Sequence, residues 1–184
     1  METENPWKIN STREVYDNNW LNVVEHQVTN PSGNPGIYGV VHFKHFAIGV
    51  LALDDEYNTW IVGQYRFALN EYSWEIPEGG GPVNVDPLIS AKRELMEECG
   101  IEAGSWSQIA ECNTSNSCTD EKVIIFLAQK LSFHRSNPEE TEVLNVKKIP
   151  FEELYRMVVQ GEIMDAPTIL ATLKAKLLMQ EGKI

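Results

Sequence analysis

The sequence of 184 residues predicts an α+β fold with a mixed sheet. Three observations predict it: β-rich segments fill the first third of the chain, one well-capped helix interrupts the strands that follow, and two helical segments close the chain. Hydrophobic residues make up 42% of the sequence, which is enough to pack a core at this length. The chain should therefore form one domain of somewhat more than average size, or a domain with a small additional segment.

The N-terminal strands are expected from β-branched and aromatic residues on both sides of a turn cluster. These residues are frequent in segments 14–30 and 36–43, and the turn cluster lies at 31–35. These turn-rich strands precede the better-patterned strands of the core. We therefore expect residues 1–44 to form a separate antiparallel β segment and residues 45–184 to form the main domain.

Core strands are expected in segments 46–54, 59–69, 72–77 and 122–131. The glycines that follow the third of these strands, at 79–81, are expected to form a loop that leads into a helix. That helix has Asp86 as a good N-cap and Pro87 as a good first residue, and Gly100 falls where a left-handed C-terminal cap would lie. Two further helices are expected over residues 151–160 and from about 167 to 179.

The charge balance excludes some partners. The formal net charge is −12 and no run of lysines and arginines occurs, so nucleic acid and anionic membrane surfaces are unfavourable partners. No apolar stretch approaches the roughly 18–20 residues of a membrane span, and the N-terminus lacks a leader pattern. The three cysteines show no metal-ligand spacing, which favours reduced thiols in a cytoplasmic protein. An anionic substrate would need bound cations that reverse the local field.

Three glutamates in the predicted central helix break local rules. Glu94, Glu97 and Glu98 share one face through i,i+3 and i,i+4 spacing, where like charges repel. They also lie in the C-terminal half, where the helix dipole favours cations by roughly 0.3–1 kcal/mol. A hard divalent cation such as Mg²⁺ would offset both costs. The alternative is a solvated acidic face, which is common on surface helices.

Residues 79–101 resemble the signature of the Nudix hydrolase family, G-x5-E-x7-R-E-U-x-E-E-x-G-U, in which U is a bulky aliphatic residue. Gly79 takes the first position, and segment 93–101 takes the last part without a gap. The first glutamate of the signature falls on Val85, and its loss should loosen Arg93 more than it removes a metal ligand. Segments 63–80 and 161–169 are similar to the ADP-ribose and nucleotide-sugar pyrophosphatase branch. The resemblance implies a mixed-sheet α/β/α sandwich.

The resemblance also implies site residues. Glu94 and Glu98 would be the main ligands of Mg²⁺, with Mn²⁺ as the alternative ion, while Glu97 would be shared between metal binding and catalysis. The backbone carbonyl of Glu78 would add an oxygen. Glu142, on a loop before a strand, would be the general base, with Glu140 as the second candidate; the alternative for both is a solvated acidic loop.

Two strand residues match positions of the branch: Arg66 matches an arginine that faces the substrate phosphate, and Glu75 matches a glutamate beside the metal site. Arg66 would bind a substrate phosphate, for which a guanidinium is suited; the alternative is an ordinary ion pair at a strand edge. Glu75 would bind a ribose or sugar hydroxyl, or would only orient Arg66.

The implied activity is Mg²⁺-dependent hydrolysis of the pyrophosphate bond of a nucleoside diphosphate sugar, such as ADP-ribose or GDP-mannose, to a nucleoside monophosphate and a sugar phosphate. The N-terminal β segment of the branch commonly builds a two-fold dimer, so we expect a homodimer. Two alternatives remain: a Nudix hydrolase for another nucleoside diphosphate compound, and a non-catalytic Nudix module that senses nucleotide sugars. The second alternative is favoured only by Val85.

Overall fold

A computed structural model of the chain describes residues 4–135 and 144–184. The chain divides into two compact units. One unit consists of Met1–His45 with Asn113–Glu121, and the other consists of Phe46–Cys112 with Lys122–Ile184. Within the described residues, no helix has both the length and the apolar character needed to cross a membrane.

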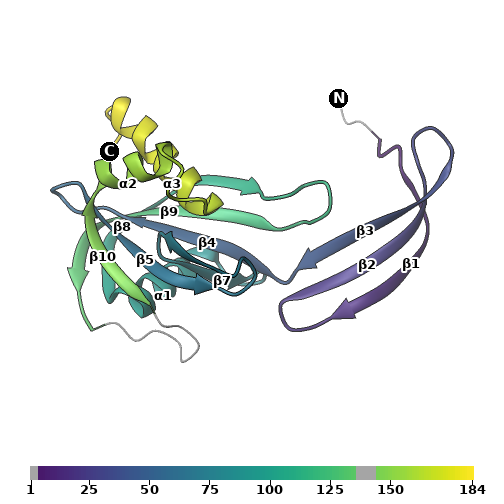
Figure 1. Cartoon of the computed structure of the whole chain (residues 1–184), viewed down its shortest axis with the longest axis horizontal. Coiled ribbons are helices and arrows are strands. Elements are labelled where there is room, and N and C mark those ends of the chain that lie inside the picture. Colours follow the sequence, from purple (N-terminus) through teal and green to yellow (C-terminus); the bar gives the residue numbers. More distant parts are fainter. Residues whose placement is uncertain (1–3, 136–143) are drawn as a thin grey trace. The chain divides into compact units, whose positions relative to one another are not determined.

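The first unit contains a three-stranded antiparallel sheet in the order β1-β2-β3 (Figure 1). The strands are β1 (Lys8–Asp17), β2 (Leu21–Thr29) and β3 (Pro35–Phe43). The predicted antiparallel N-terminal strands are confirmed, although segment 14–30 is divided between two of them. A turn separates β1 from β2, and the side chain of Asn18 closes it by accepting from the backbone N–H groups of Trp20 and Leu21.

The second unit contains two further sheets. One has the order β7-β4-β9-β8, with β4 and β9 parallel, and the other has the antiparallel order β10-β5-β6. Their strands are β4 (His45–Ala52), β5 (Asn58–Arg66), β6 (Glu71–Glu75), β7 (Glu78–Pro82), β8 (Ile101–Asn113), β9 (Lys122–Phe133) and β10 (Asn145–Pro150). The helices are α1 (Pro87–Cys99), α2 (Phe151–Val159) and α3 (Ala166–Gln180).

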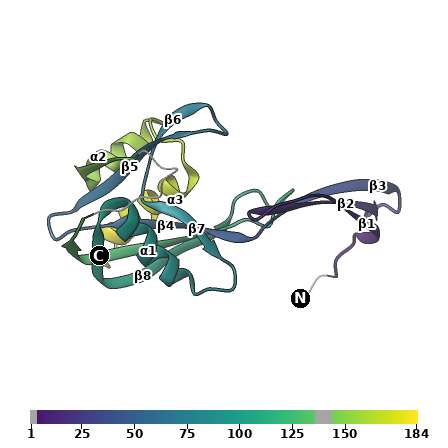
Figure 2. The ribbon, with the colours of Figure 1, turned by 90° about the horizontal axis from the view of Figure 1, so that it is seen from below.

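Strands β4 and β9 form the middle layer of a sandwich. Helix α1 lies on one side of these strands, and α2 and α3 lie on the other (Figures 1 and 2). Because side chains alternate along a strand, the layer supplies two cores. Val50 joins Leu95 of α1 in one core, whereas Leu51 joins Phe151 and Ala171 of α2 and α3 in the other. The predicted mixed-sheet α/β/α fold is confirmed.

The local structure around α1 is partly as predicted. Asp86 caps its N-terminus by accepting from the backbone N–H of Leu88, and Gly100 ends it with φ 65°. The glycines before α1, however, form strand β7 and not a loop. The loop prediction was wrong because β7 lies beside β4 in the sheet, and tertiary pairing overrides the weak strand propensity of glycine. Strand β8 was also missed.

Candidate active site

Helix α1 directs two glutamates against strand β7. Glu94 is only 7% exposed and Glu98 only 1% exposed. The backbone N–H of Glu78 donates to Oε2 of Glu98 over 3.0 Å. At Gly79, a Cβ atom would fall far inside 3.0 Å of the Glu94 carboxylate, a separation that real Cβ atoms essentially never show. The absence of a side chain at Gly79 therefore allows the strand to pass directly over this carboxylate.

Arg93 connects α1 to the glycine strand. Its guanidinium contacts Glu97 at 2.6 Å, Glu94 at 2.5 Å and the backbone carbonyl oxygen of Gly80 at 3.0 Å. These three contacts hold Arg93 although Val85 stands where the signature has a glutamate.

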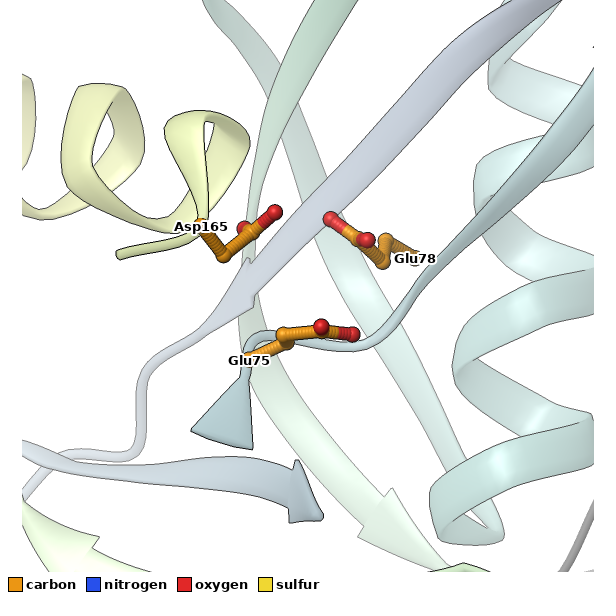
Figure 3. Close-up of side chains that lie close together, drawn as sticks. All are labelled: Glu75, Glu78 and Asp165. Carbon is orange, nitrogen blue, oxygen red and sulfur yellow. The ribbon is translucent and has the colours of Figure 1, made fainter. Parts of the chain in front are cut away.

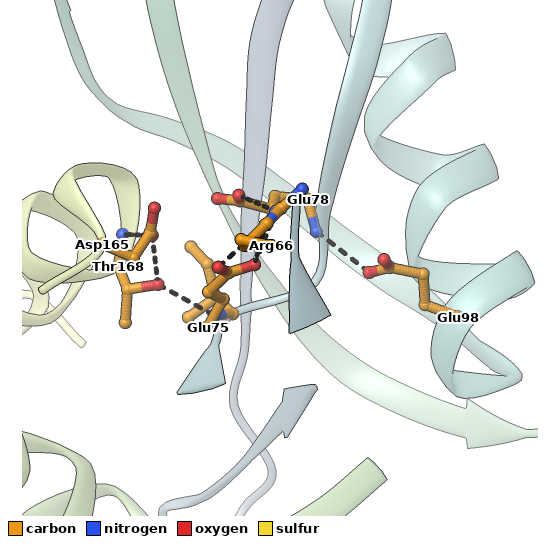
Figure 4. A network of polar contacts seen from close by, with 7 residues as sticks. Arg66, Glu75, Glu78, Glu98, Asp165 and Thr168 are labelled. Atoms are coloured by element: carbon orange, nitrogen blue, oxygen red, sulfur yellow. Dashed lines mark hydrogen bonds and ion pairs between the residues drawn. The ribbon is translucent and has the colours of Figure 1, made fainter. Parts of the chain in front are cut away.

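Arg66, at the end of β5, forms the second charged centre (Figure 4). Its Nε donates to both oxygens of Glu75 at 2.9 and 3.0 Å, and its Nη2 donates to Oε2 of Glu75 at 2.5 Å and to Oε1 of Glu78 at 2.6 Å. Glu75 is 2% exposed. The Arg66 side chain is 36% exposed, so its ion pairs join a buried carboxylate to a partly exposed guanidinium. Its binding of a substrate phosphate stays a prediction.

Asp165 is a third acidic group, and it lies close to Glu75 and Glu78 (Figure 3). Carboxylate oxygens of Glu75, Glu78 and Asp165 all lie within 4.8 Å of one another. Asp165 is the N-cap of α3, where its Oδ2 accepts from the backbone N–H of Thr168 at 2.8 Å and from the hydroxyl of that residue at 2.6 Å. The same hydroxyl accepts from the backbone N–H of Ile76 at 2.9 Å, which fixes the end of α3 against the strand segment before β7.

The site has an excess of buried negative charge. Burial, followed by repulsion from Asp165 and Glu75, raises the pKa of Glu78 well above its ordinary value. Burial also raises the pKa of Asp165. Oε2 of Glu78 is buried and has no hydrogen-bond partner among the described residues. Arg66 offsets part of this charge through its ion pairs with Glu75 and Glu78. The buried carboxylates of Glu94 and Glu98 on α1 supply oxygen donors of the kind that fits a hard divalent cation.

The predicted site residues therefore fall into three groups. Arg66, Glu75, Glu78 and Glu98 are joined by hydrogen bonds, while Glu94 and Glu97 are joined to Arg93. Glu140 and Glu142 lie outside the described residues. Within the described residues, the one group of three acidic side chains close enough to share a cation contains no residue of α1.

Sequence reasoning missed Asp165 as a site residue. This residue lies in segment 161–169, just before the last predicted helix, and was given no role. Its N-cap position is the signal that could have indicated it. The side chain of an N-cap residue accepts hydrogen bonds from the helix, so its carboxylate is held in one orientation. The strand that carries Glu75 is brought to that cap by tertiary structure, which the local sequence does not specify.

Comparison with known proteins identifies the family of the chain. A model described as NUDIX domain matches residues 43–169, and one described as nucleoside diphosphate sugar hydrolase N-terminal domain matches residues 7–41. The ADP-ribose pyrophosphatase of Bacillus subtilis (strain 168) is 32% identical, over 86% of this chain and 86% of its own. That of Mycobacterium tuberculosis (strain ATCC 25618 / H37Rv) is also 32% identical, over 80% of this chain and 72% of its own.

A GDP-mannose pyrophosphatase of Escherichia coli O9:H4 (strain HS) is 29% identical over 61% of this chain and 58% of its own. A crystal structure of an ADP compounds hydrolase superposes with a TM-score of 0.86 and covers 100% of both chains at 17% identity, which shows a common fold. The fold is an α/β/α sandwich that holds a cluster of acidic side chains. The chain belongs to the NUDIX family and is a Nudix hydrolase.

Proposed function

We propose that the protein hydrolyses the pyrophosphate bond of a nucleoside diphosphate sugar, such as ADP-ribose or GDP-mannose, and releases a nucleoside monophosphate and a sugar phosphate. The observation that carries the proposal is the pair of buried carboxylates, Glu94 and Glu98, that α1 presents beneath β7 beside the charged centre of Arg66. The names of the similar pyrophosphatases support the substrate class.

The ion is Mg²⁺ in this proposal, with Mn²⁺ as the alternative. Glu94 and Glu98 would hold it, Glu97 would be shared with catalysis, and the backbone carbonyl of Glu78 would add a donor. When bound, the cation neutralises charge on a pyrophosphate and acidifies water. All of these donors are oxygens, which suits a hard ion.

Arg66 would bind an oxygen of the substrate's pyrophosphate. Its hydrogen bonds to Glu75 and Glu78 use Nε and Nη2. Nη1 makes no hydrogen bond with the described residues, so in this proposal its two N–H groups donate to a phosphate oxygen in the fixed geometry of a guanidinium. In this proposal Glu75 orients Arg66, since both of its carboxylate oxygens are engaged by that residue.

Glu142 would act as the general base and would take a proton from the attacking water. We expect the Glu142→Gln variant to lose about 10²-fold in kcat, which is at the lower end of the contribution of a general base, because Glu140 offers a neighbouring carboxylate. Steady-state kinetics with ADP-ribose checks this, and Glu140→Gln serves as the matched control. A larger loss in the Glu140 variant would exchange the two roles.

Val85 is the position at which the signature is broken, and it raises the alternative of a non-catalytic module. We expect Val85→Glu to change kcat by no more than about threefold, well below the 10–100-fold typical of outer partners of a metal site, because Arg93 is already held by Glu94, Glu97 and Gly80. The Val85→Gln variant controls for size. A tenfold gain confined to the glutamate variant would show that pairing of Arg93 limits the enzyme.

We propose that the protein is a homodimer in the cytoplasm, and that residues 1–44 form the segment through which the two chains associate. All residues of β1 are exposed, including Ile9, Val15 and Tyr16, and exposed apolar side chains on one sheet are typical of an interface. Sedimentation of the full chain and of a variant with charged residues at Ile9 and Val15 tests the dimer.

The substrate class is tested by incubating the protein with a panel of diphosphate compounds and Mg²⁺. We expect turnover of nucleotide sugars and slower turnover of dinucleoside polyphosphates, coenzymes and RNA caps. Cleavage of the latter compounds alone would show that the enzyme acts on another nucleoside diphosphate compound. Tight binding of nucleotide sugars without turnover at saturating Mg²⁺ would instead indicate a sensor module.

A further inference from the structure

Glu78 contacts both charged centres of the site through different atoms. Its backbone N–H donates to Oε2 of Glu98 on α1, over 3.0 Å. Its side-chain Oε1 accepts from Nη2 of Arg66 on β5, over 2.6 Å. Figure 4 shows Glu78 lying between these two residues. One residue therefore joins the arginine that would bind the substrate to the helix that would bind the cation.

The side chain of Glu78 supplies a contact that Glu75 does not replace. Glu75 accepts hydrogen bonds from Nε and Nη2 of Arg66, along one edge of the guanidinium. Glu78, which lies on β7, accepts a hydrogen bond from Nη2. The guanidinium is therefore held by two carboxylates from two different strands. A guanidinium is planar and its donors are fixed. Two anchors therefore determine the direction of Nη1, which makes no hydrogen bond with the described residues, and one anchor leaves it freer to tilt.

The surroundings restrict the Glu78 carboxylate to this contact. Its side chain is 13% exposed, and its second oxygen has no hydrogen-bond partner among the described residues. Asp165, held in place by Thr168, brings a like charge within 4.8 Å. Repulsion between like charges at this separation is strong where water is excluded, and Arg66 is the cation that contacts two of the three carboxylates.

We propose that the Glu78 side chain is a positioning residue for substrate binding: it fixes Arg66 in the orientation that receives the pyrophosphate and ties that orientation to Glu98 through its own backbone. This role is separate from that of the Glu78 carbonyl toward the cation. The inference rests on the proposed function, because it requires a substrate with a phosphate for Arg66.

Two substitutions separate the side chain from the backbone. Glu78→Ala removes the carboxylate and keeps the peptide N–H and C=O groups, so the contact to Glu98 remains. Glu78→Gln keeps an oxygen that accepts from Nη2 of Arg66. We expect Glu78→Ala to raise the KM for ADP-ribose about tenfold, as loss of a hydrogen bond to a charged group does, with a smaller change in kcat. We expect Glu78→Gln to restore KM to within about threefold of the parent.

Metal binding and a double-mutant cycle complete the test. Mn²⁺ affinity, measured by electron paramagnetic resonance without substrate, should be the same in the parent and in both variants. Glu78→Ala should add nothing in an Arg66→Ala background, because the effect of Glu78 acts through that arginine. Additive effects in the cycle, or a loss of Mn²⁺ affinity in Glu78→Ala, would overturn the positioning role. A parent that binds Mn²⁺ but cleaves no compound of the panel would instead refute the proposed function on which that role rests.

Discussion

The Glu98→Gln variant is expected to keep its fold and to lose about 10³-fold or more of its turnover, because the charge stabilisation that a bound cation supplies is worth several kcal/mol. Glu98 is 1% exposed, so the substitution changes a carboxylate that water does not reach. Glutamine has almost the same shape and keeps an oxygen that accepts from the backbone N–H of Glu78. It lacks the negative charge that a divalent cation requires.

Thermal unfolding distinguishes this loss from a loss of structure. Without added metal, the Glu98→Gln variant should unfold at the same temperature as the parent or higher, because a buried charge near other carboxylates has been removed. The rise in unfolding temperature that Mg²⁺ produces in the parent should be absent, since a ligand stabilises only the state that binds it. Glu102→Gln, at an exposed position of β8, is the control. Near-parental turnover in folded Glu98→Gln would refute the metal assignment.

The fold was predictable where its signals are local. The bounds of α1 follow from Asp86 and Gly100, because a cap and a left-handed terminus are each specified by one residue. Strands β7 and β8 were not predictable in this way. The run of glycines at 79–81 indicates a loop by composition, and β7 becomes a strand because it lies beside β4 in the sheet. Pairing partners far apart in the sequence decide such cases.

The same distinction applies to the site. The placement of Glu94 and Glu98 on one face of a single helix was predictable, because it follows from their fixed spacing in the sequence. Their role as cation ligands was implied by the family resemblance and stays a prediction. An orienting contact of Glu75 with Arg66 was one of its two predicted roles. The contact of the Glu78 side chain with Arg66 was not predicted, and neither was the approach of Asp165, because these four residues come from β5, β6, β7 and the start of α3. Their meeting depends on the assembled sandwich, so only the structure could reveal it.

Gly79 tests whether the strand above α1 must lack a side chain. Its Cβ would collide with the carboxylate of Glu94, and the helix backbone beneath is fixed by Ala91 and Leu95 in the core. The part that can move is the end of the Glu94 side chain, which can swing away at a modest cost. The backbone of Gly79 does not have a positive φ, so an alanine needs no change of backbone conformation there. The collision therefore displaces a site group and leaves the fold intact.

We expect Gly79→Ala to lower the free energy of unfolding by about 1 kcal/mol, a typical value for a point substitution. We expect kcat/KM to fall by about 10²–10³-fold. A misplacement of about 1 Å in a catalytic site costs about 10²-fold, and Glu94 would also hold the cation less well. Chemical denaturation and steady-state kinetics measure the two quantities, and Mn²⁺ affinity should fall along with activity. Gly39→Ala, in a strand where the new Cβ meets nothing within 4 Å, is the matched control. Parental activity and Mn²⁺ affinity in Gly79→Ala would mean that the position of the Glu94 carboxylate beneath β7 has no part in cation binding.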